Sequence, residues 1–366
     1  ARDYYANDTE YTDDSLTNVD SYIDEIVNGE KNTLVGHVKW VGYGNKENCY
    51  ILDDRGNLYS TSEYTSETDY QKEKIEDLQI ELTNISMTDS FNAVTNDNKI
   101  MFYDNDTREW KEASVDESFP GILALEGEII DINGYYWNIN SEGELIKDEY
   151  RTYSILPDEE ISIKEIQSKS SNIAVIDENG KLWMQGENDR GQLGNGTTEY
   201  SDVLIPVSGI NKKIVRIEMS YDGESIMALD EDGSVWIWGE NHSTVPQKVN
   251  NVNKRIIDIL IGGNDFSALD EEGNVWFLYD VDNPKKIECD VKIKKIVGKT
   301  NTNGIDENGE IWIISTEGKG NLSRIDETEN PFYGQKIEEA YYSVKSWGNV
   351  DIYINNEYII WEKSGW

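Results

Sequence analysis

The sequence has few of the residues that build catalytic and metal centres. Its 366 residues include two cysteines and two histidines. Cys49 and Cys289 lie far apart and outside any Cys-x-x-Cys or Cys/His cluster, so their spacing supports neither a disulfide nor a zinc site. No phosphate-binding loop, Gly-x-Ser-x-Gly elbow or His-Glu-x-x-His helix occurs. We therefore expect no catalytic residue, no cofactor and no resident metal, and hence a protein that is not an enzyme.

Basic residues and long apolar runs are also scarce. Lys and Arg total 33 against 72 Asp and Glu, which gives a formal net charge of −39. This charge argues against nucleic acid or an anionic membrane surface as the main partner. The acidity either maintains solubility or favours a basic protein, peptide or cation as partner. No apolar run reaches the roughly 18 residues that a membrane helix needs, so no membrane insertion is expected.

What the sequence does contain is an internal repeat. Residues 173–183 read Ile-Ala-Val-Ile-Asp-Glu-Asn-Gly-Lys-Leu-Trp, and residues 226–236 read Ile-Met-Ala-Leu-Asp-Glu-Asp-Gly-Ser-Val-Trp. Two apolar runs around Asp-Glu-x-Gly predict a β-hairpin, because Gly adopts the positive φ that the turn needs. The strands are apolar on both faces, since Ile226 and Ala228 alternate with Met227 and Leu229. Such strands must be covered on both faces.

An alternating strand at 214–219 precedes this hairpin, and a proline-containing segment typical of an edge strand follows it at 245–249. Each unit is therefore predicted to have four short antiparallel strands. One such sheet cannot cover both of its own faces, but a closed ring of sheets can. We predict an all-β fold, a β-propeller of four-stranded antiparallel blades, over residues 31–366.

Eight hairpin turns recur at an average spacing of about 43 residues, which is the length of a propeller blade. They lie at 53–56, 95–98, 140–143, 177–180, 230–233, 270–273, 306–309 and, shortened, 355–356. The aromatic residues expected after the turns are Tyr59, Phe102, Trp183, Trp236, Trp276 and Trp312. Leu145 and Ile146 interrupt this column.

The two ends of the chain differ from the repeats. Residues 1–30 are expected to form an acidic N-terminal arm, and the chain begins at Ala1 without Met, as after removal of a leader or at a truncated end. The last repeat stops before a fourth strand. We expect residues 21–27 to supply that strand and close the ring.

Residues 183–196 carry a longer motif. It has Trp183, Gly186, Asn188, Gly191, Gln192, Leu193, Gly194 and Gly196, followed by Pro206-Val207. This resembles the signature of the regulator of chromosome condensation repeat family, Trp-x-x-Gly-x-Asn-x-x-Gly-Gln-Leu-Gly-x-Gly, and residues 236–241 carry its first half. The resemblance implies a β-propeller, here of bacterial type. Family members usually have seven blades, so seven is the alternative to eight. The best-known member exchanges nucleotide on a small GTPase and docks on chromatin, and many members are adaptor domains.

The longest loop, 187–204, is the predicted contact site for a partner. The candidate contact residues are Asn188, Asp189, Arg190 and His242. Polar residues of the inner strands are expected to line the central channel: Arg216, Glu218, Asp258 and Lys295.

We expect a monomeric, non-enzymatic scaffold that binds a protein partner. It is expected outside the cell or at the cell surface, with the cytoplasm as the alternative. An aromatic face that binds or cleaves carbohydrate is the alternative function, because exposed aromatic rings are common at binding sites. Nucleotide exchange on a small GTPase is a third hypothesis.

Overall fold

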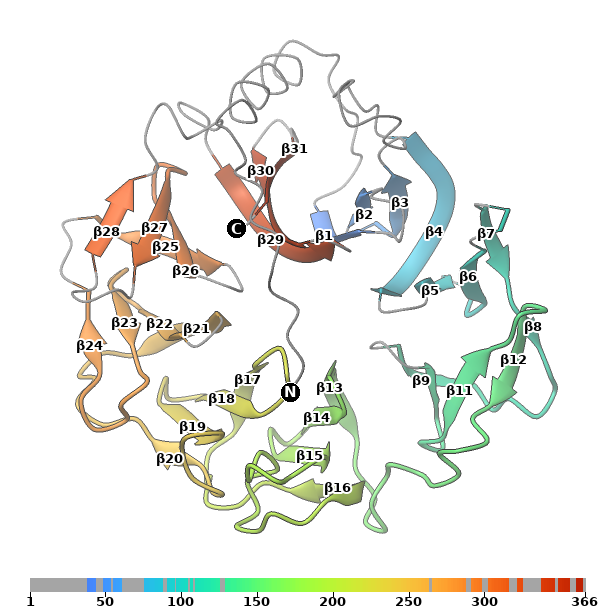
Figure 1. Ribbon diagram of the computed structural model, residues 1–366, viewed down its shortest axis with the longest axis horizontal. Helices are drawn as coiled ribbons and strands as arrows, with labels where there is room; N and C mark the ends of the chain where they lie inside the picture. Colours follow the sequence, from blue (N-terminus) through green and yellow to red (C-terminus); the bar gives the residue numbers. More distant parts are fainter. Residues whose placement is uncertain are drawn as a thin grey trace, which may run out of the picture.

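The computed structural model is built from β-strands arranged as sheets around a central opening (Figure 1). It describes residues 38–43, 49–53, 55–60, 76–87, 91–95, 97–104, 106–107, 109–125, 129–262, 265–287, 291–297, 302–315, 321–324, 337–345, 348–355 and 360–364. Within these residues the strands form eight blades, which confirms the propeller and the predicted count. The predicted N-terminal arm and the ring-closing strand at 21–27 lie outside the described residues.

The first two blades share one continuous sheet. Its strands are β1 (Val38–Tyr43), β2 (Cys49–Asp53), β3 (Asn57–Ser60), β4 (Glu76–Met87), β5 (Phe91–Thr95), β6 (Ile100–Asp104) and β7 (Glu109–Glu112). The long strand β4 pairs with β3 through Glu76 to Glu81 and with β5 through Leu82 to Met87. It therefore serves as the outer strand of blade 1 and the inner strand of blade 2.

Blade 3 contains β9 (Ile122–Leu125), β10 (Ile129–Asp131), β11 (Tyr136–Ile139) and β12 (Glu144–Lys147), and β8 (Ser114–Val115) joins β12 in parallel. A hairpin turn does lie at 140–143, as predicted, but it joins the third and fourth strands; the central turn of this blade is 131–134, between β10 and β11. Trp137 donates its indole N–H to Asp131, as Trp183 does to Asp177. Trp137 therefore fills the position that we assigned to Leu145 and Ile146.

The aromatic column also needs a correction in blade 2. Met101 pairs with Ala93 in the same register in which Trp183 pairs with Val175. Phe102 is therefore one residue past the column, and it packs toward blade 3 instead of blade 1.

Blades 4 to 7 each have four antiparallel strands in chain order. Blade 4 has β13 (Ile163–Lys169), β14 (Asn172–Asp177), β15 (Leu182–Gly186) and β16 (Ser201–Pro206), and blade 5 has β17 (Ile214–Met219), β18 (Ser225–Asp230), β19 (Val235–Gly239) and β20 (Gln247–Lys248). Blade 6 has β21 (Ile256–Gly262), β22 (Asp265–Asp270), β23 (Val275–Phe277) and β24 (Lys285–Lys286), and blade 7 has β25 (Ile293–Val297), β26 (Thr302–Asp306), β27 (Ile311–Ser315) and β28 (Asn321–Arg324).

Blade 8 closes the ring. Its described strands are β29 (Ile337–Lys345), β30 (Gly348–Asn355) and β31 (Ile360–Ser364). Strand β29 contacts β1 of the first blade, so the two ends of the repeat array meet (Figure 1). No helix among the described residues has the length and apolar character needed to cross a bilayer.

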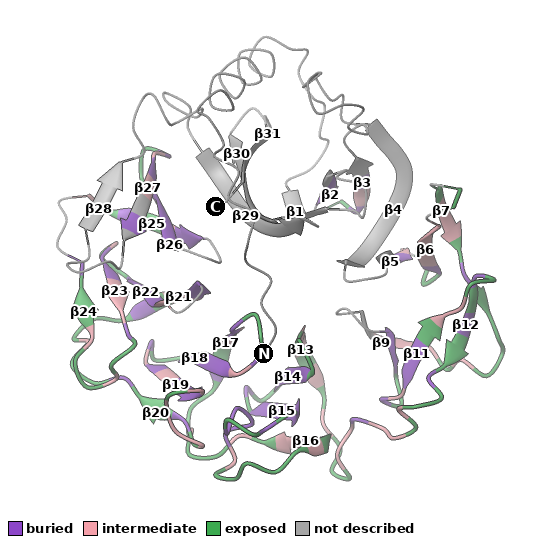
Figure 2. Ribbon diagram, viewed as in Figure 1, coloured by how far each residue is buried: buried purple, intermediate pink, exposed green. Residues whose placement is uncertain are grey.

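The hydrophobic core lies between consecutive blades, and in blades 4 and 5 the two middle strands are almost entirely buried (Figure 2). Strand β18 shows the division. Ile226 and Ala228 pack against blade 4, whereas Met227 and Leu229 pack against blade 6. The prediction that these strands are covered on both faces is confirmed.

Backbone hydrogen bonds also join neighbouring blades. In blades 3 to 6, the carbonyl oxygen of the glycine in the central turn accepts from an amide in the next blade or in the segment that leads into it. The distances are 2.9 Å for Gly134 and Ile155, 2.8 Å for Gly180 and Ile214, 3.1 Å for Gly233 and Ile256, and 2.9 Å for Gly273 and Ile293. We call these four bonds the turn clasps.

Candidate partner-binding face

Four loops gather on one face of blades 4 to 6. In an antiparallel blade, the connection between the first and second strands and the one between the third and fourth strands leave the sheet at the same edge. Loops 187–200, 220–224, 240–246 and 278–284 therefore share one face, and the Asp-x-x-Gly turns lie on the other. We call the face that carries these four loops the loop face.

Gly186 ends β15 and starts the long loop 187–200. Its φ is +120°, and a β-carbon at this position would lie 2.1 Å from the carbonyl oxygen of Ser171. Gly239 of blade 5 has a φ of +95°, and its β-carbon would lie 2.1 Å from the carbonyl oxygen of Glu224. The end of each third strand thus touches the preceding loop backbone to backbone, which explains the glycine of the Trp-x-x-Gly motif.

Asn188 holds the long loop together from inside. It is only 2% exposed. Its Nδ2 donates to the carbonyl oxygens of Thr197 at 3.1 Å and Glu199 at 3.0 Å, and its Oδ1 accepts from the backbone N of Leu193 at 2.9 Å. We therefore assign Asn188 a structural role and withdraw it as a contact residue.

The same loop is fixed to the next blade. The indole Nε1 of Trp238 donates to the carbonyl oxygen of Gln192 at 2.8 Å. The backbone N of Gly196 donates to the carbonyl oxygen of Thr244 at 2.9 Å. Leu193 is buried in the core between blades 4 and 5. The Gly-Gln-Leu-Gly part of the motif is thus the contact between two blades.

Asp189 and Arg190 are exposed on this fixed loop, as a contact role requires. The Arg190 Nε lies 3.5 Å from Glu224 Oε2 and 3.9 Å from Asp189 Oδ2. The guanidinium therefore lies at the border between the long loop and the acidic loops of blade 5.

Three carboxylates meet beside Arg190. One oxygen from each of Asp222, Glu224 and Glu240 lies within 4.8 Å of the others. Burial and the negative charges of Asp222 and Glu240 raise the pKa of Glu224, and Arg190 opposes this shift. Carboxylate oxygens are ligands of Ca²⁺ and Mg²⁺. Carboxylates also crowd without an ion in so acidic a chain, so we assign no metal to them.

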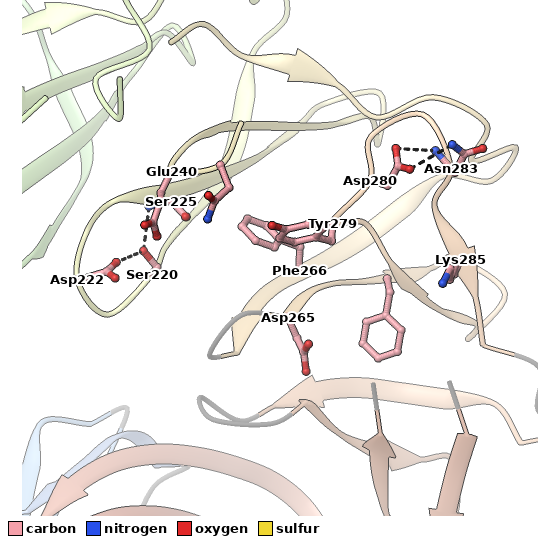
Figure 3. A pocket seen from close by; sticks show the side chains of 12 residues that line it. Ser220, Asp222, Ser225, Glu240, Asp265, Phe266, Tyr279, Asp280, Asn283 and Lys285 are labelled. Atoms are coloured by element: carbon pink, nitrogen blue, oxygen red, sulfur yellow. Dashed lines mark hydrogen bonds between the residues drawn. The ribbon is translucent and has the colours of Figure 1, made fainter. Parts of the chain in front are cut away.

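A pocket of about 590 Å³ lies between blades 5 and 6 on the loop face (Figure 3). Blade 5 contributes Ser220, Asp222, Ser225, Glu240 and Asn241, and blade 6 contributes Asp265, Phe266, Phe277, Tyr279, Asp280, Asn283 and Lys285. The rings of Phe266 and Tyr279 lie at the centre, with centroids 5.9 Å apart.

His242 supports the same two rings from blade 5. Its ring centroid lies 5.1 Å from that of Phe266 and 5.4 Å from that of Tyr279. Burial lowers the pKa of His242, so the imidazole is neutral at pH 7. Its Nε2 is buried and meets no hydrogen-bond partner among the described residues. The structure therefore places His242 against the two rings at the centre of the pocket.

Tyr279 is the residue of this face that sequence reasoning missed. Blades 4 and 5 have Trp-x-x-Gly at the end of the third strand, but blade 6 has Trp276-Phe277-Leu278-Tyr279. Strand β23 ends at Phe277, and Tyr279 lies beyond it with 54% of its surface exposed. The tyrosine that replaces the motif glycine is visible in the sequence and could have indicated this site.

The predicted channel residues lie on the inner strands around the central opening (Figure 1). Arg216 bridges two of them, with Nη2 2.8 Å from Glu218 Oε1 and Nη1 2.5 Å from Asp258 Oδ1. Burial raises the pKa of both carboxyl groups, and Arg216 opposes the shift. The contact between Arg216 and Asp258 joins blades 5 and 6.

Comparison with known proteins agrees with this architecture. Residues 179–222 match the family model of the regulator of chromosome condensation (RCC1) repeat, and this segment contains loop 187–200. The zebrafish Protein RCC2 homolog is 30% identical over 89 residues, which are 24% of this chain and 18% of that protein. Human Protein RCC2 is 32% identical over 74 residues, 20% of this chain and 14% of that protein. The chain thus matches less than a fifth of either relative.

Solved structures share the fold over nearly the whole chain. Human WBSCR16 is 11% identical with a TM-score of 0.51, and 88% of each chain is covered. The computationally designed Ika8 protein is 12% identical with a TM-score of 0.55, covering 92% of this chain and 100% of that one. The chain is a β-propeller in which residues 179–222, in blades 4 and 5, are similar to the repeat of the regulator of chromosome condensation family.

Proposed function

We propose that this chain is a non-catalytic propeller that binds a protein partner through its loop face. The observation that carries the proposal is the rigidity of loop 187–200. Asn188 ties its two ends, and Trp238 and Thr244 fix it to blade 5, while Asp189 and Arg190 stay exposed. A contact loop that is ordered before binding loses less conformational entropy when the partner docks.

The charge of the loop face indicates the kind of partner. Asp222, Glu224 and Glu240 lie together, and Asp189 adds a fourth carboxylate beside them, against the single guanidinium of Arg190. Opposite charge steers association and selects against acidic surfaces. A protein with a basic surface is therefore the partner that we propose, and its binding should weaken as salt is raised.

Affinity capture from an extract of the source cells tests this function. The intact chain is compared with a loop-face variant, Asp189→Lys with Glu240→Lys, and with a matched variant of the opposite face, Glu178→Lys with Glu231→Lys. Both variants change the charge equally at exposed or half-exposed side chains. We expect a partner to be retained by the intact chain and the opposite-face variant and lost by the loop-face variant. Equal capture by all three proteins would refute the proposed face.

A further inference from the structure

The pocket between blades 5 and 6 is built around a fixed group of rings. Phe266 is buried and cannot turn away, and His242 packs against both Phe266 and Tyr279. Tyr279 is held on one side by these contacts and exposed on the other. An exposed aromatic ring that is fixed in this way is a ready contact surface, because it loses little side-chain freedom on binding.

The rim of the pocket carries a strong negative charge. Its lining has four carboxylates, Asp222, Glu240, Asp265 and Asp280, and one ammonium group, Lys285. Hydrogen bonds from Asn283 and from the backbone N of Asp282 lower the pKa of Asp280, so this carboxyl group is ionised at neutral pH. The neighbouring His242 is neutral and does not offset the charge.

Carboxylates around aromatic rings match one common protein group. A guanidinium is planar, stacks on aromatic faces and pairs with two carboxylate oxygens at once. An ammonium group carries the same charge, but it is more strongly hydrated and offers no flat face. Phosphate and carboxylate ligands would face the negative rim and are repelled.

We propose that this pocket receives an arginine side chain of the protein partner. The guanidinium stacks on Tyr279, and carboxylates from both blades, Glu240 on one side and Asp265 or Asp280 on the other, surround it. The volume of about 590 Å³ admits one arginine with its flanking backbone. This inference rests on the proposed function, because it names the anchor by which the partner docks on the loop face.

Ligand-observed saturation-transfer NMR tests the pocket directly. The probes are the Nα-acetyl methylamides of arginine, lysine and citrulline, titrated into the full chain. Citrulline has nearly the shape of arginine without its charge. We expect saturation of the arginine probe, weaker saturation of the lysine probe and none of the citrulline probe. Equal saturation of arginine and citrulline would overturn the proposal.

Two pocket variants make the test specific. Tyr279→Leu keeps apolar bulk without the aromatic face, and we expect the dissociation constant of the arginine probe to rise by about tenfold. Glu240→Gln with Asp265→Asn removes two of the four carboxylates and should weaken the salt dependence of binding. Tyr150→Ala is the matched control, because Tyr150 is 94% exposed in the segment between blades 3 and 4. Arginine binding that survives both pocket variants would place the probe elsewhere and refute the inference.

The capture experiment separates failure of the pocket from failure of the function. If Tyr279→Leu still retains a partner that the loop-face variant loses, and the arginine probe does not compete, the arginine pocket is wrong and the loop face stands. If the loop-face variant loses nothing, the proposed function is wrong whatever the arginine probe does. Release of the partner by the arginine probe, but not by the citrulline probe, supports both.

Discussion

A single aspartate organises each regular turn of this propeller. In blade 4, Asp177 Oδ1 accepts from the backbone N of Asn179 and of Lys181, both at 2.9 Å, and Oδ2 accepts from the indole of Trp183 at 3.0 Å. The same three bonds recur at Asp131, Asp230, Asp270 and Asp306. The carboxylate therefore explains why Asp and Trp repeat six residues apart.

Replacement of this aspartate is predicted to be costly. Asp177→Ala leaves the buried indole N–H of Trp183 and two turn amides without their acceptor, and each lost bond to a charged group contributes about 1.5 kcal/mol or more before relaxation. We expect the free energy of unfolding to fall by roughly 3 kcal/mol, measured by urea denaturation. Glu178→Ala in the same turn is the control, because Glu178 is exposed and should change stability by less than about 0.5 kcal/mol. Equal effects of the two variants would contradict the role of the carboxylate.

Individual residues also show where sequence reasoning stopped. The repeat predicted the turn, the Trp column and the two-sided burial of β18, because these follow from periodicity. It did not reveal that Asn188 points inward, since a polar residue in a loop looks the same whether it bonds to its own backbone or to solvent. The importance of Tyr279 could have been predicted, but only with the knowledge that the motif glycine makes a close backbone contact that a side chain would block.

Loop 187–200 behaves as one element although it has no regular secondary structure. Asn188→Ala removes two donated bonds and one accepted bond that tie its ends. We expect trypsin to cleave after Arg190 at least about tenfold faster in this variant, because the free energy needed to open the loop locally falls by roughly 2 kcal/mol. Thr198→Ala should leave cleavage unchanged, since Thr198 is exposed in the same loop and lies away from Arg190 in sequence. Unchanged proteolysis of Asn188→Ala would show that the contacts to blade 5 suffice.

Blade 3 shows why element boundaries were harder to predict than element number. Asn140 Oδ1 accepts from the backbone N of Glu142 and Glu144, as Asp177 does from Asn179 and Lys181. The turn at 140–143 therefore has the same local chemistry as a central turn, although it joins β11 to β12. The central turn differs from it in the indole bond from Trp137 to Asp131 and in the clasp from Ile155 to Gly134, and the residues of the turn alone show neither contact.

At the scale of the whole molecule, the burial of the Glu218 and Asp258 carboxyl groups couples stability to pH. Glu218 and Asp258 have pKa values above their ordinary ones, so the folded state holds their protons more tightly than the unfolded state does. Their contribution to stability is present below the ordinary carboxyl pKa and is lost as pH rises through the raised value. The other charged groups near this pair are Glu165, Lys169 and Lys295.

Glu218→Gln isolates this effect from the general repulsion of the acidic surface. We expect the intact chain to gain stability relative to the variant as pH falls from 7 toward 4, measured by urea denaturation at each pH. The surface repulsion is nearly common to both proteins and cancels in the difference. Glu178→Gln removes one charge at an exposed side chain and is the control for the loss of charge alone. A stability difference between the intact chain and Glu218→Gln that does not change with pH would rule out a raised pKa of Glu218.

The turn clasps imply an order in which the blades become stable during synthesis. In blades 3 to 6, the glycine carbonyl of the central turn accepts from an amide in the blade that follows it along the chain, or in the segment leading into that blade. A nascent chain leaves the ribosome from its N-terminus. The carbonyl group of such a turn therefore gains its hydrogen bond only after the next blade has been synthesised. Stability during synthesis should therefore rise in steps. Each newly emerged blade supplies the missing hydrogen bond to the turn before it, while its own turn still lacks a partner.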